Sequence, residues 1–189
     1  MSTARRLHYS YEDYLALLAE SSIKLEYCDG VIYAMAGGTI AHAALAAAAI
    51  RVLGAALPPG CTVYSSDLKV RVEPTGLATF PDVSIACGPP IPSARDAHAL
   101  TNPTILVEVT SRSTEDYDRG EKLSHYKQIA SLRAVLFISH REARITLVER
   151  AEDGWSERDV RPGEHLRAAC LEREIAVDDV YAGIALDPR

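Results

Sequence analysis

The chain has 189 residues, of which 48% are hydrophobic and 24% charged, the composition of an ordinary globular protein with a substantial core. Its formal net charge of −6 argues against a protein that binds nucleic acid through a broad basic surface. No apolar run is long enough to span a membrane, and residues 1–8 lack the apolar core of a signal peptide. We therefore expect a single domain over residues 1–189, in the cytoplasm and without membrane contact.

The cysteines are scattered along the chain and form no Cys-x-x-Cys pair: Cys28, Cys61, Cys87 and Cys170. Such spacing argues against a structural zinc site and is typical of reduced thiols in a cytoplasm. We therefore expect free thiols.

The N-terminal part predicts a helix followed by a β-hairpin. Ser10 and Asp13 have the spacing of a capping box, and apolar residues then recur at helical spacing. Asp29-Gly30 lies between two extended runs, which is a strong signal for a hairpin over residues 23–35. Glu26 lies in the first strand of this hairpin.

An alanine-rich helix is predicted over residues 39–57, with Thr39 as its N-terminal cap. His42 lies on the apolar face of this helix, and we interpret it as a core residue rather than a ligand. Apolar and charged residues alternate over 68–72, which predicts a strand with one exposed face. The segment 87–103 is rich in Gly and Pro and predicts a surface loop. Farther along, residues 133–160 predict a three-stranded meander.

Acidic residues within apolar runs single out the middle of the chain. Asp82 lies in the predicted strand 80–85, and Glu108 lies in the predicted strand 105–110. Burial of an ionised group is costly unless the group is paired, hydrogen-bonded or bound to a metal. Because two carboxylates on adjacent strands repel each other, we expect a divalent cation between them.

A lysine follows on the next predicted helix. The helical pattern begins near Asp118, and Lys122 precedes Tyr126 by four residues, which places it at the edge of the buried stripe. We interpret Asp118 and Glu121 as solvated charges at the start of the helix. A lysine beside the acidic pair can orient a water molecule or neutralise charge.

Each of these residues also has a structural interpretation. Asp82 can cap a turn, Glu26 can face solvent at the hairpin, and Lys122 can be an ordinary helix lysine. Glu108 can be the structural partner of one of three basic residues: Arg112, Arg119 or Lys122. The joint spacing of the set favours an acidic site.

The ordered phrases resemble a known family. Pro81-Asp82 followed by Glu108-Val109-Thr110 resembles the PD-(D/E)XK nuclease superfamily. Further phrases resemble the Uma-two family of restriction-endonuclease-like proteins: Leu25–Gly30, Phe80–Val83, Leu106–Ser111, Tyr117–Leu123 and Tyr126. The resemblance covers nearly the whole chain and implies an α/β, restriction-endonuclease-like fold with a mixed central sheet flanked by helices.

The resemblance also implies roles for particular residues. Asp82, Glu108 and the main-chain carbonyl of Val109 would bind Mg²⁺ or Mn²⁺, and Glu26 would support the metal site. The superfamily pattern has a lysine two residues after the glutamate, where this chain has Thr110. The resemblance suggests that the lysine has moved to the following helix.

The implied catalytic set is therefore Asp82, Glu108, Lys122 and Glu26, which leads to two functional hypotheses. The first is a metal-dependent endonuclease that hydrolyses DNA with a metal-activated water. The second is a catalytically inactive homodimeric protein on the same fold, which binds nucleic acid or another partner. The negative charge and the missing Glu-x-Lys lysine favour the second. A homodimer is expected in either case.

Overall fold

The computed structural model describes residues 8–35, 37–110 and 115–187. Its central layer is a six-stranded sheet whose strands β9 and β10 are parallel, whereas all other neighbours are antiparallel. The predicted meander is confirmed as its last three strands in the chain. In spatial order the strands are β12 (Gly154–Val160), β11 (Ile145–Ala151), β10 (Ala134–Ser139), β9 (Ile105–Thr110), β6 (Val83–Cys87) and β3 (Cys61–Ser65).

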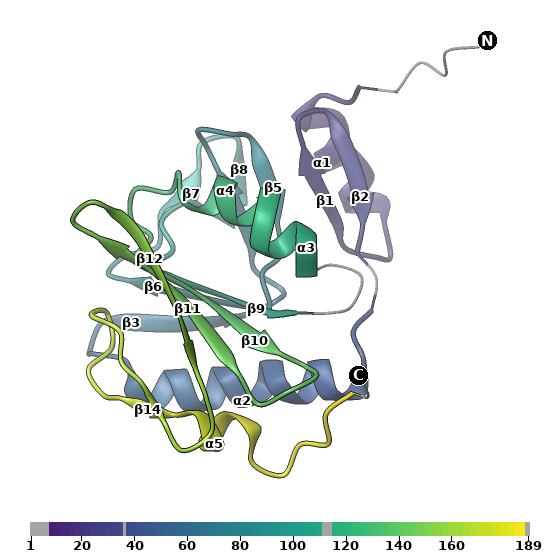
Figure 1. Cartoon of the computed structure of the whole chain (residues 1–189). Helices are drawn as coiled ribbons and strands as arrows, with labels where there is room; N and C mark the ends of the chain where they lie inside the picture. Colours follow the sequence, from purple (N-terminus) through teal and green to yellow (C-terminus); the bar gives the residue numbers. More distant parts are fainter. Residues whose placement is uncertain (1–7, 36, 111–114, 188–189) are drawn as a thin grey trace.

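Two helices, α2 (Ile40–Ala56) and α5 (Val177–Tyr181), cover one face of this sheet (Figure 1). As predicted, Thr39 caps α2, because its hydroxyl accepts a hydrogen bond from the His42 amide at 3.2 Å. Side chains of α2 such as Leu45 pack on alternate residues of β9 and β10. A two-stranded ribbon, β13 (His165–Leu166) and β14 (Ile175–Ala176), precedes α5.

The opposite face carries a second six-stranded sheet and a short helical segment. That segment runs through α3 (Glu115–Tyr117), the π-helical turn η1 (Asp118–Lys122) and α4 (Leu123–Tyr126). Leu106 of β9 packs against this segment, so the side chains of β9 point alternately to the two layers. The second sheet contains, in spatial order, β2 (Val31–Ala34), β1 (Leu25–Cys28), β5 (Leu77–Thr79), β4 (Lys69–Val72), β8 (Asp96–Leu100) and β7 (Pro92–Ser93).

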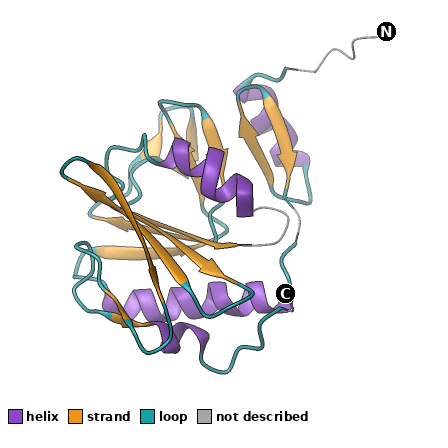
Figure 2. Cartoon of the chain, in the orientation of Figure 1, coloured by secondary structure: helices purple, strands orange, loops and turns teal. Residues whose placement is uncertain are grey.

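The predicted N-terminal helix and hairpin are present as α1 (Tyr11–Glu20) and the β1–β2 pair (Figure 2). Ser10 and Asp13 form the capping box. Tyr11, Tyr14 and Tyr27 lie in contact and fix α1 on the hairpin. Among the described helices, none is long and apolar enough to cross a membrane.

Two expectations about the second sheet are wrong. Strand β4 has no exposed face, because Lys69 and Arg71 are buried together with its valines. Lys69 pairs with Asp96 at 2.6 Å, and the Arg71 guanidinium stacks on Tyr11, so both charges have partners. The expected loop 87–103 contains β7 and β8, and β8 pairs with β4 in parallel.

The expectation of free thiols is wrong for two of the cysteines. Cys61 and Cys87 lie directly opposite each other on β3 and β6 and form a disulfide. Cys28 and Cys170 are free. The two cysteines are 26 residues apart, and their pairing depends on the register of β3 against β6, which cysteine spacing does not reveal.

Candidate functional site

Glu108 is the most deeply placed acidic residue of the predicted site. All six residues of β9 are buried, and Glu108 points to the same face as Leu106, toward the helical segment. The Tyr126 hydroxyl donates a hydrogen bond to Glu108 Oε1 at 2.5 Å, and Lys122 Nζ lies 3.0 Å from the same oxygen. Of the three proposed basic partners, Glu108 therefore contacts Lys122.

Arg119 does not supply that contact. Arg119 binds Glu157 at 2.5 Å and the Thr146 hydroxyl at 3.0 Å instead. Arg112 lies outside the described residues.

Lys122 reaches the acidic residues from the π-helical turn. Its side chain is 5% exposed, and Nζ lies 3.4 Å from Glu26 and 3.6 Å from Asp118 in addition to the contact with Glu108. Asp118 is buried, so its interpretation as a solvated charge is wrong, whereas Glu121 is exposed. A π-helical turn changes the register of a helix and is common at functional sites. Here both ends of the turn contribute a buried charge.

The charge of Lys122 is stabilised by these neighbours. Burial alone would lower its pKa, but Glu108, with smaller contributions from Tyr126, Glu26 and Asp118, raises the pKa of Lys122 well above its ordinary value. The amine is therefore a cation at neutral pH.

Glu26 joins the site from the hairpin. The Thr79 hydroxyl donates a hydrogen bond to its Oε1, and the Phe80 amide donates to the same oxygen at 3.4 Å. Because β1 pairs with β5, the strand just before Pro81 and Asp82, Glu26 lies close to the start of the acidic motif. It is buried and does not face solvent.

Asp82 lies just before β6 and bridges two parts of the main sheet. Its Oδ2 accepts a hydrogen bond from the Val109 amide at 2.7 Å. The same oxygen lies 3.3 Å from His42 Nε2. Asp82 thus contacts the residue after Glu108, which brings the two predicted carboxylates to one end of β9.

His42 is the residue whose place the sequence interpretation missed. It is not a core residue, because its side chain is 21% exposed and pairs with Asp82. The hydrogen bond to Asp82 raises the pKa of His42 most, burial opposes this, and the charge of Glu108 and the Val109 main chain add to the rise. A positive charge is unfavourable in the first turn of a helix, so a histidine there was a signal for an acidic partner.

The site has more acidic than basic groups. Burial raises the pKa of Glu108 to about 8, Lys122 opposes this, and Asp118 and Asp82 raise it further. Asp82 accepts a hydrogen bond from the amide of the residue after Glu108, so the two carboxylates lie at the same end of β9. A divalent cation would relieve this repulsion.

The donor atoms fit a hard cation such as Mg²⁺. Within the described ranges, the contacts of Asp82 use Oδ2 and those of Glu108 use Oε1. Among the described residues, the second oxygen of each carboxylate makes no hydrogen bond or ion pair, and oxygen is the ligand atom that Mg²⁺ prefers. Thr110, at the usual lysine position, is buried, and its hydroxyl has no partner among the residues described.

Comparison with known proteins identifies the family. A family model for Uma2, described as "Putative restriction endonuclease", matches residues 11–178. The chain belongs to the Uma2 family. The predicted relationship is thereby confirmed.

Relatives of this Uma2 protein occur in cyanobacteria. "Uncharacterized protein slr1290" of Synechocystis sp. (strain ATCC 27184 / PCC 6803 / Kazusa) is 34% identical over 93% of this chain and 93% of its own length. "Uncharacterized protein sll1609" of the same strain is 26% identical over 67% of this chain and 72% of its own.

A crystal structure shares the fold. It is described as "a putative nuclease belonging to DUF820" from Anabaena variabilis ATCC 29413, and it matches with a TM-score of 0.75. The match covers 92% of this chain and 98% of the other, at 15% sequence identity. The predicted α/β, restriction-endonuclease-like fold is confirmed.

Proposed function

We propose that this Uma2 protein is a metal-dependent endonuclease that hydrolyses phosphodiester bonds of DNA. The observation that carries the proposal is the position of Lys122, whose Nζ lies 3.0 Å from Glu108 and 3.4 Å from Glu26. The superfamily pattern has a lysine two residues after the glutamate, and Thr110 occupies that position here. Lys122, from the helical segment, lies beside Glu108 in its place.

The proposed metal ligands are the carboxylates of Asp82 and Glu108 and the carbonyl of Val109. Bound Mg²⁺ or Mn²⁺ would lower the pKa of a coordinated water and stabilise the charge that develops on the phosphate. Two features support this assignment: one oxygen of Asp82 and one of Glu108 have no partner within the described residues, and negative charge is in excess at the site.

The remaining residues position these groups and balance their charge. Lys122 is a cation that can orient the attacking water or neutralise a phosphate oxygen. Glu26 and Asp118 hold its amine, and Tyr126 holds Glu108 through the phenolic hydrogen bond. His42 lies beside Asp82, whose hydrogen bond raises the pKa of the imidazole, and offers a second basic group to the phosphate backbone. DNA as the substrate, a homodimeric assembly and a cytoplasmic location are parts of the same proposal.

A plasmid-nicking assay tests the proposal. We expect the protein to relax supercoiled DNA with Mg²⁺ or Mn²⁺ and to stop when a chelator is added. Asp82→Asn and Glu108→Gln should each remove cleavage, because each takes away a charged ligand. Asp67→Asn is the control, since Asp67 is an exposed carboxylate paired only with Lys24 among the described residues.

Two outcomes contradict the proposal. Cleavage retained by both site variants would remove these carboxylates from the mechanism. A wild-type protein that binds DNA but cleaves no form of it with either metal would favour the inactive binding protein.

A further inference from the structure

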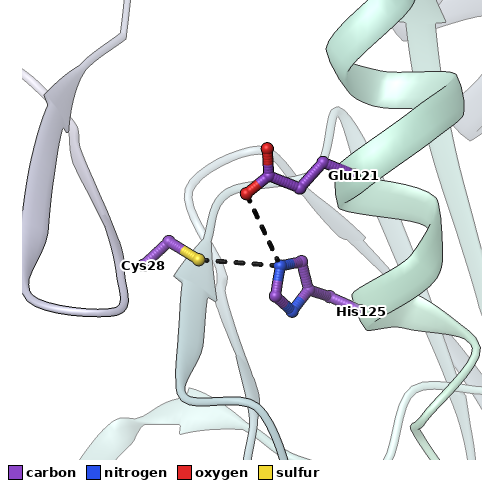
Figure 3. A group of neighbouring side chains, drawn as sticks. All are labelled: Cys28, Glu121 and His125. Atoms are coloured by element: carbon purple, nitrogen blue, oxygen red, sulfur yellow. Dashed lines mark hydrogen bonds and ion pairs between the residues drawn. The ribbon is translucent and has the colours of Figure 1, made fainter.

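Cys28, Glu121 and His125 form a second group of candidate metal ligands, separate from the acidic site (Figure 3). Cys28 is the last residue of β1, whereas Glu121 and His125 are four residues apart on the helical segment and share one face. One ligand atom from each residue lies within 4.8 Å of the other two. In Figure 3 the three side chains point toward one another across the space between hairpin and helix.

The distances fit a tetrahedral zinc site. Cys28 Sγ lies 3.6 Å from His125 Nε2, and Glu121 Oε1 lies 4.0 Å from the same nitrogen. Zn–S and Zn–N bonds of about 2.3 Å and about 2.0 Å at a tetrahedral angle separate sulfur and nitrogen by about 3.5 Å. The Cys28–His125 pair therefore already has the required spacing. The Glu121 side chain is 63% exposed, so a rotamer change can bring its carboxylate closer.

The ligands of this cluster favour a different metal ion than those of the acidic site. Cys28 is 6% exposed and borders a hydrophobic cluster, and its Sγ also lies 3.6 Å from the imidazole Nε2 of His125. Thiolate and imidazole ligands favour Zn²⁺, whereas the oxygens of Asp82 and Glu108 favour Mg²⁺. His125 Nε2 is the ring atom that faces Cys28 and Glu121, whereas Nδ1 is buried.

We propose that Cys28, Glu121 and His125 bind a single Zn²⁺ ion, with water completing the coordination. The ion would fasten the β1–β2 hairpin to the helical segment. Glu26 lies two residues before Cys28, and Lys122 directly follows Glu121, so the ion would link the two elements that meet at the Lys122–Glu26 contact of 3.4 Å. Zinc binding at this cluster requires no nuclease activity.

Cysteine spacing could not reveal this cluster. Cys28 and His125 are 97 residues apart in the chain, and the hairpin and the helix come together only in the fold.

Metal titration with matched cysteine variants tests the proposal. The full chain is titrated with Zn²⁺ alone in equilibrium dialysis, and with Co²⁺ to detect the thiolate-to-cobalt charge-transfer band. We expect one Zn²⁺ per chain and a thiolate band. Cys28→Ser should lose the band and weaken Zn²⁺ binding on the order of a hundredfold or more, since loss of even an outer-shell partner costs tenfold to a hundredfold. Cys170→Ser, which changes the other free thiol, should leave both unchanged.

Two further variants separate this site from the acidic one and from misfolding. Glu108→Gln should keep the thiolate band, because the oxygen ligands of the acidic site take no part. Glu121→Gln changes an exposed side chain, so it should fold normally, keep the band and bind Zn²⁺ more weakly. Equal Zn²⁺ affinity of wild type and Cys28→Ser, or a wild-type protein without a thiolate band at saturating Co²⁺, would overturn the proposal.

Discussion

Two buried clusters in this molecule contain the same three kinds of side chain: a carboxylate, a lysine and a tyrosine whose hydroxyl donates to the carboxylate. In the first, Glu108 accepts from Tyr126 at 2.5 Å and lies 3.0 Å from Lys122. Three more carboxylates interact with this pair, among them Glu26 and Asp118. Negative charge is in excess, and the pKa of Glu108 is raised, first by burial.

In the second cluster the positive and negative charges are balanced. Asp96 accepts from Tyr11 at 2.9 Å and lies 2.6 Å from Lys69, and the His98 amide donates to its other oxygen at 3.0 Å. Burial would raise the pKa of Asp96, but the hydrogen bonds of Lys69 and Tyr11 outweigh it and lower the pKa. A buried carboxylate with enough partners is structural. A buried carboxylate among further acids is where we propose a cation.

The largest expected difference between the two clusters is the loss of stability when the lysine of each is replaced. Lys69→Met leaves Asp96 charged in the core without its ion-pair partner, so it should lower the free energy of unfolding by about 3–5 kcal/mol. Lys122→Met should cost less at neutral pH, because Glu108, whose pKa is about 8, is mostly protonated there and is not left as a buried charge. Urea unfolding with a chelator present measures both. Lys24→Met, which breaks an exposed pair with Asp67, is the control and should change little. Equal losses for the two buried lysines would contradict the comparison.

The next difference is in activity. If Lys122 acts on the reacting phosphate or water, Lys122→Met should reduce DNA cleavage on the order of 100-fold or more, as loss of one electrostatic contact to a transition state does. Lys69→Met should leave the rate per folded molecule unchanged, because its ion pair lies in the second sheet with Asp96. Rates are normalised to the folded fraction from circular dichroism. A matching loss in Lys69→Met would place both lysines in a purely structural role.

The comparison also explains how much the sequence could predict. The hairpin, the helix capped by Thr39 and the buried strand around Glu108 are coded by local signals: turn residues, a cap and an apolar run. The site residues could be selected because each lies in a recognisable sequence motif: Asp82, Glu108, Glu26 and Lys122. Their gathering in one place followed from the order of strands.

What escaped prediction depends on contacts between distant segments. The Lys69–Asp96 pair turns an alternating strand into a fully buried one, and the pattern of β4 alone cannot show a partner on β8. The burial of Asp118 follows from the π-helical turn, for which the sequence has no simple signal. His42 looked like a core residue because its acidic partner lies 40 residues further along the chain.

The last expected difference is a pair of opposite pH dependences of stability. Glu108 has a folded-state pKa of about 8 against an ordinary value of 4.5, so between these values the folded protein binds more protons than the unfolded chain. Stability in the presence of a chelator should therefore fall as the pH rises through this range. Asp96 has a lowered pKa, so it contributes stability above its ordinary value of 3.8 that is lost as the pH falls through the lower, folded-state pKa.

Denaturant titrations over this range, with Glu108→Gln beside wild type, measure the first effect. We expect Glu108→Gln to flatten the fall above the ordinary glutamate pKa, and saturating Mn²⁺ to flatten it in the wild type, because a cation favours the ionised carboxylate. The loss of stability at low pH that depends on Asp96 should be the same in both proteins, since Asp96 belongs to the other cluster. A wild-type protein whose stability is constant up to the pKa of Glu108 would mean that the acidic cluster carries no excess charge, and the reason to place a cation there would be lost.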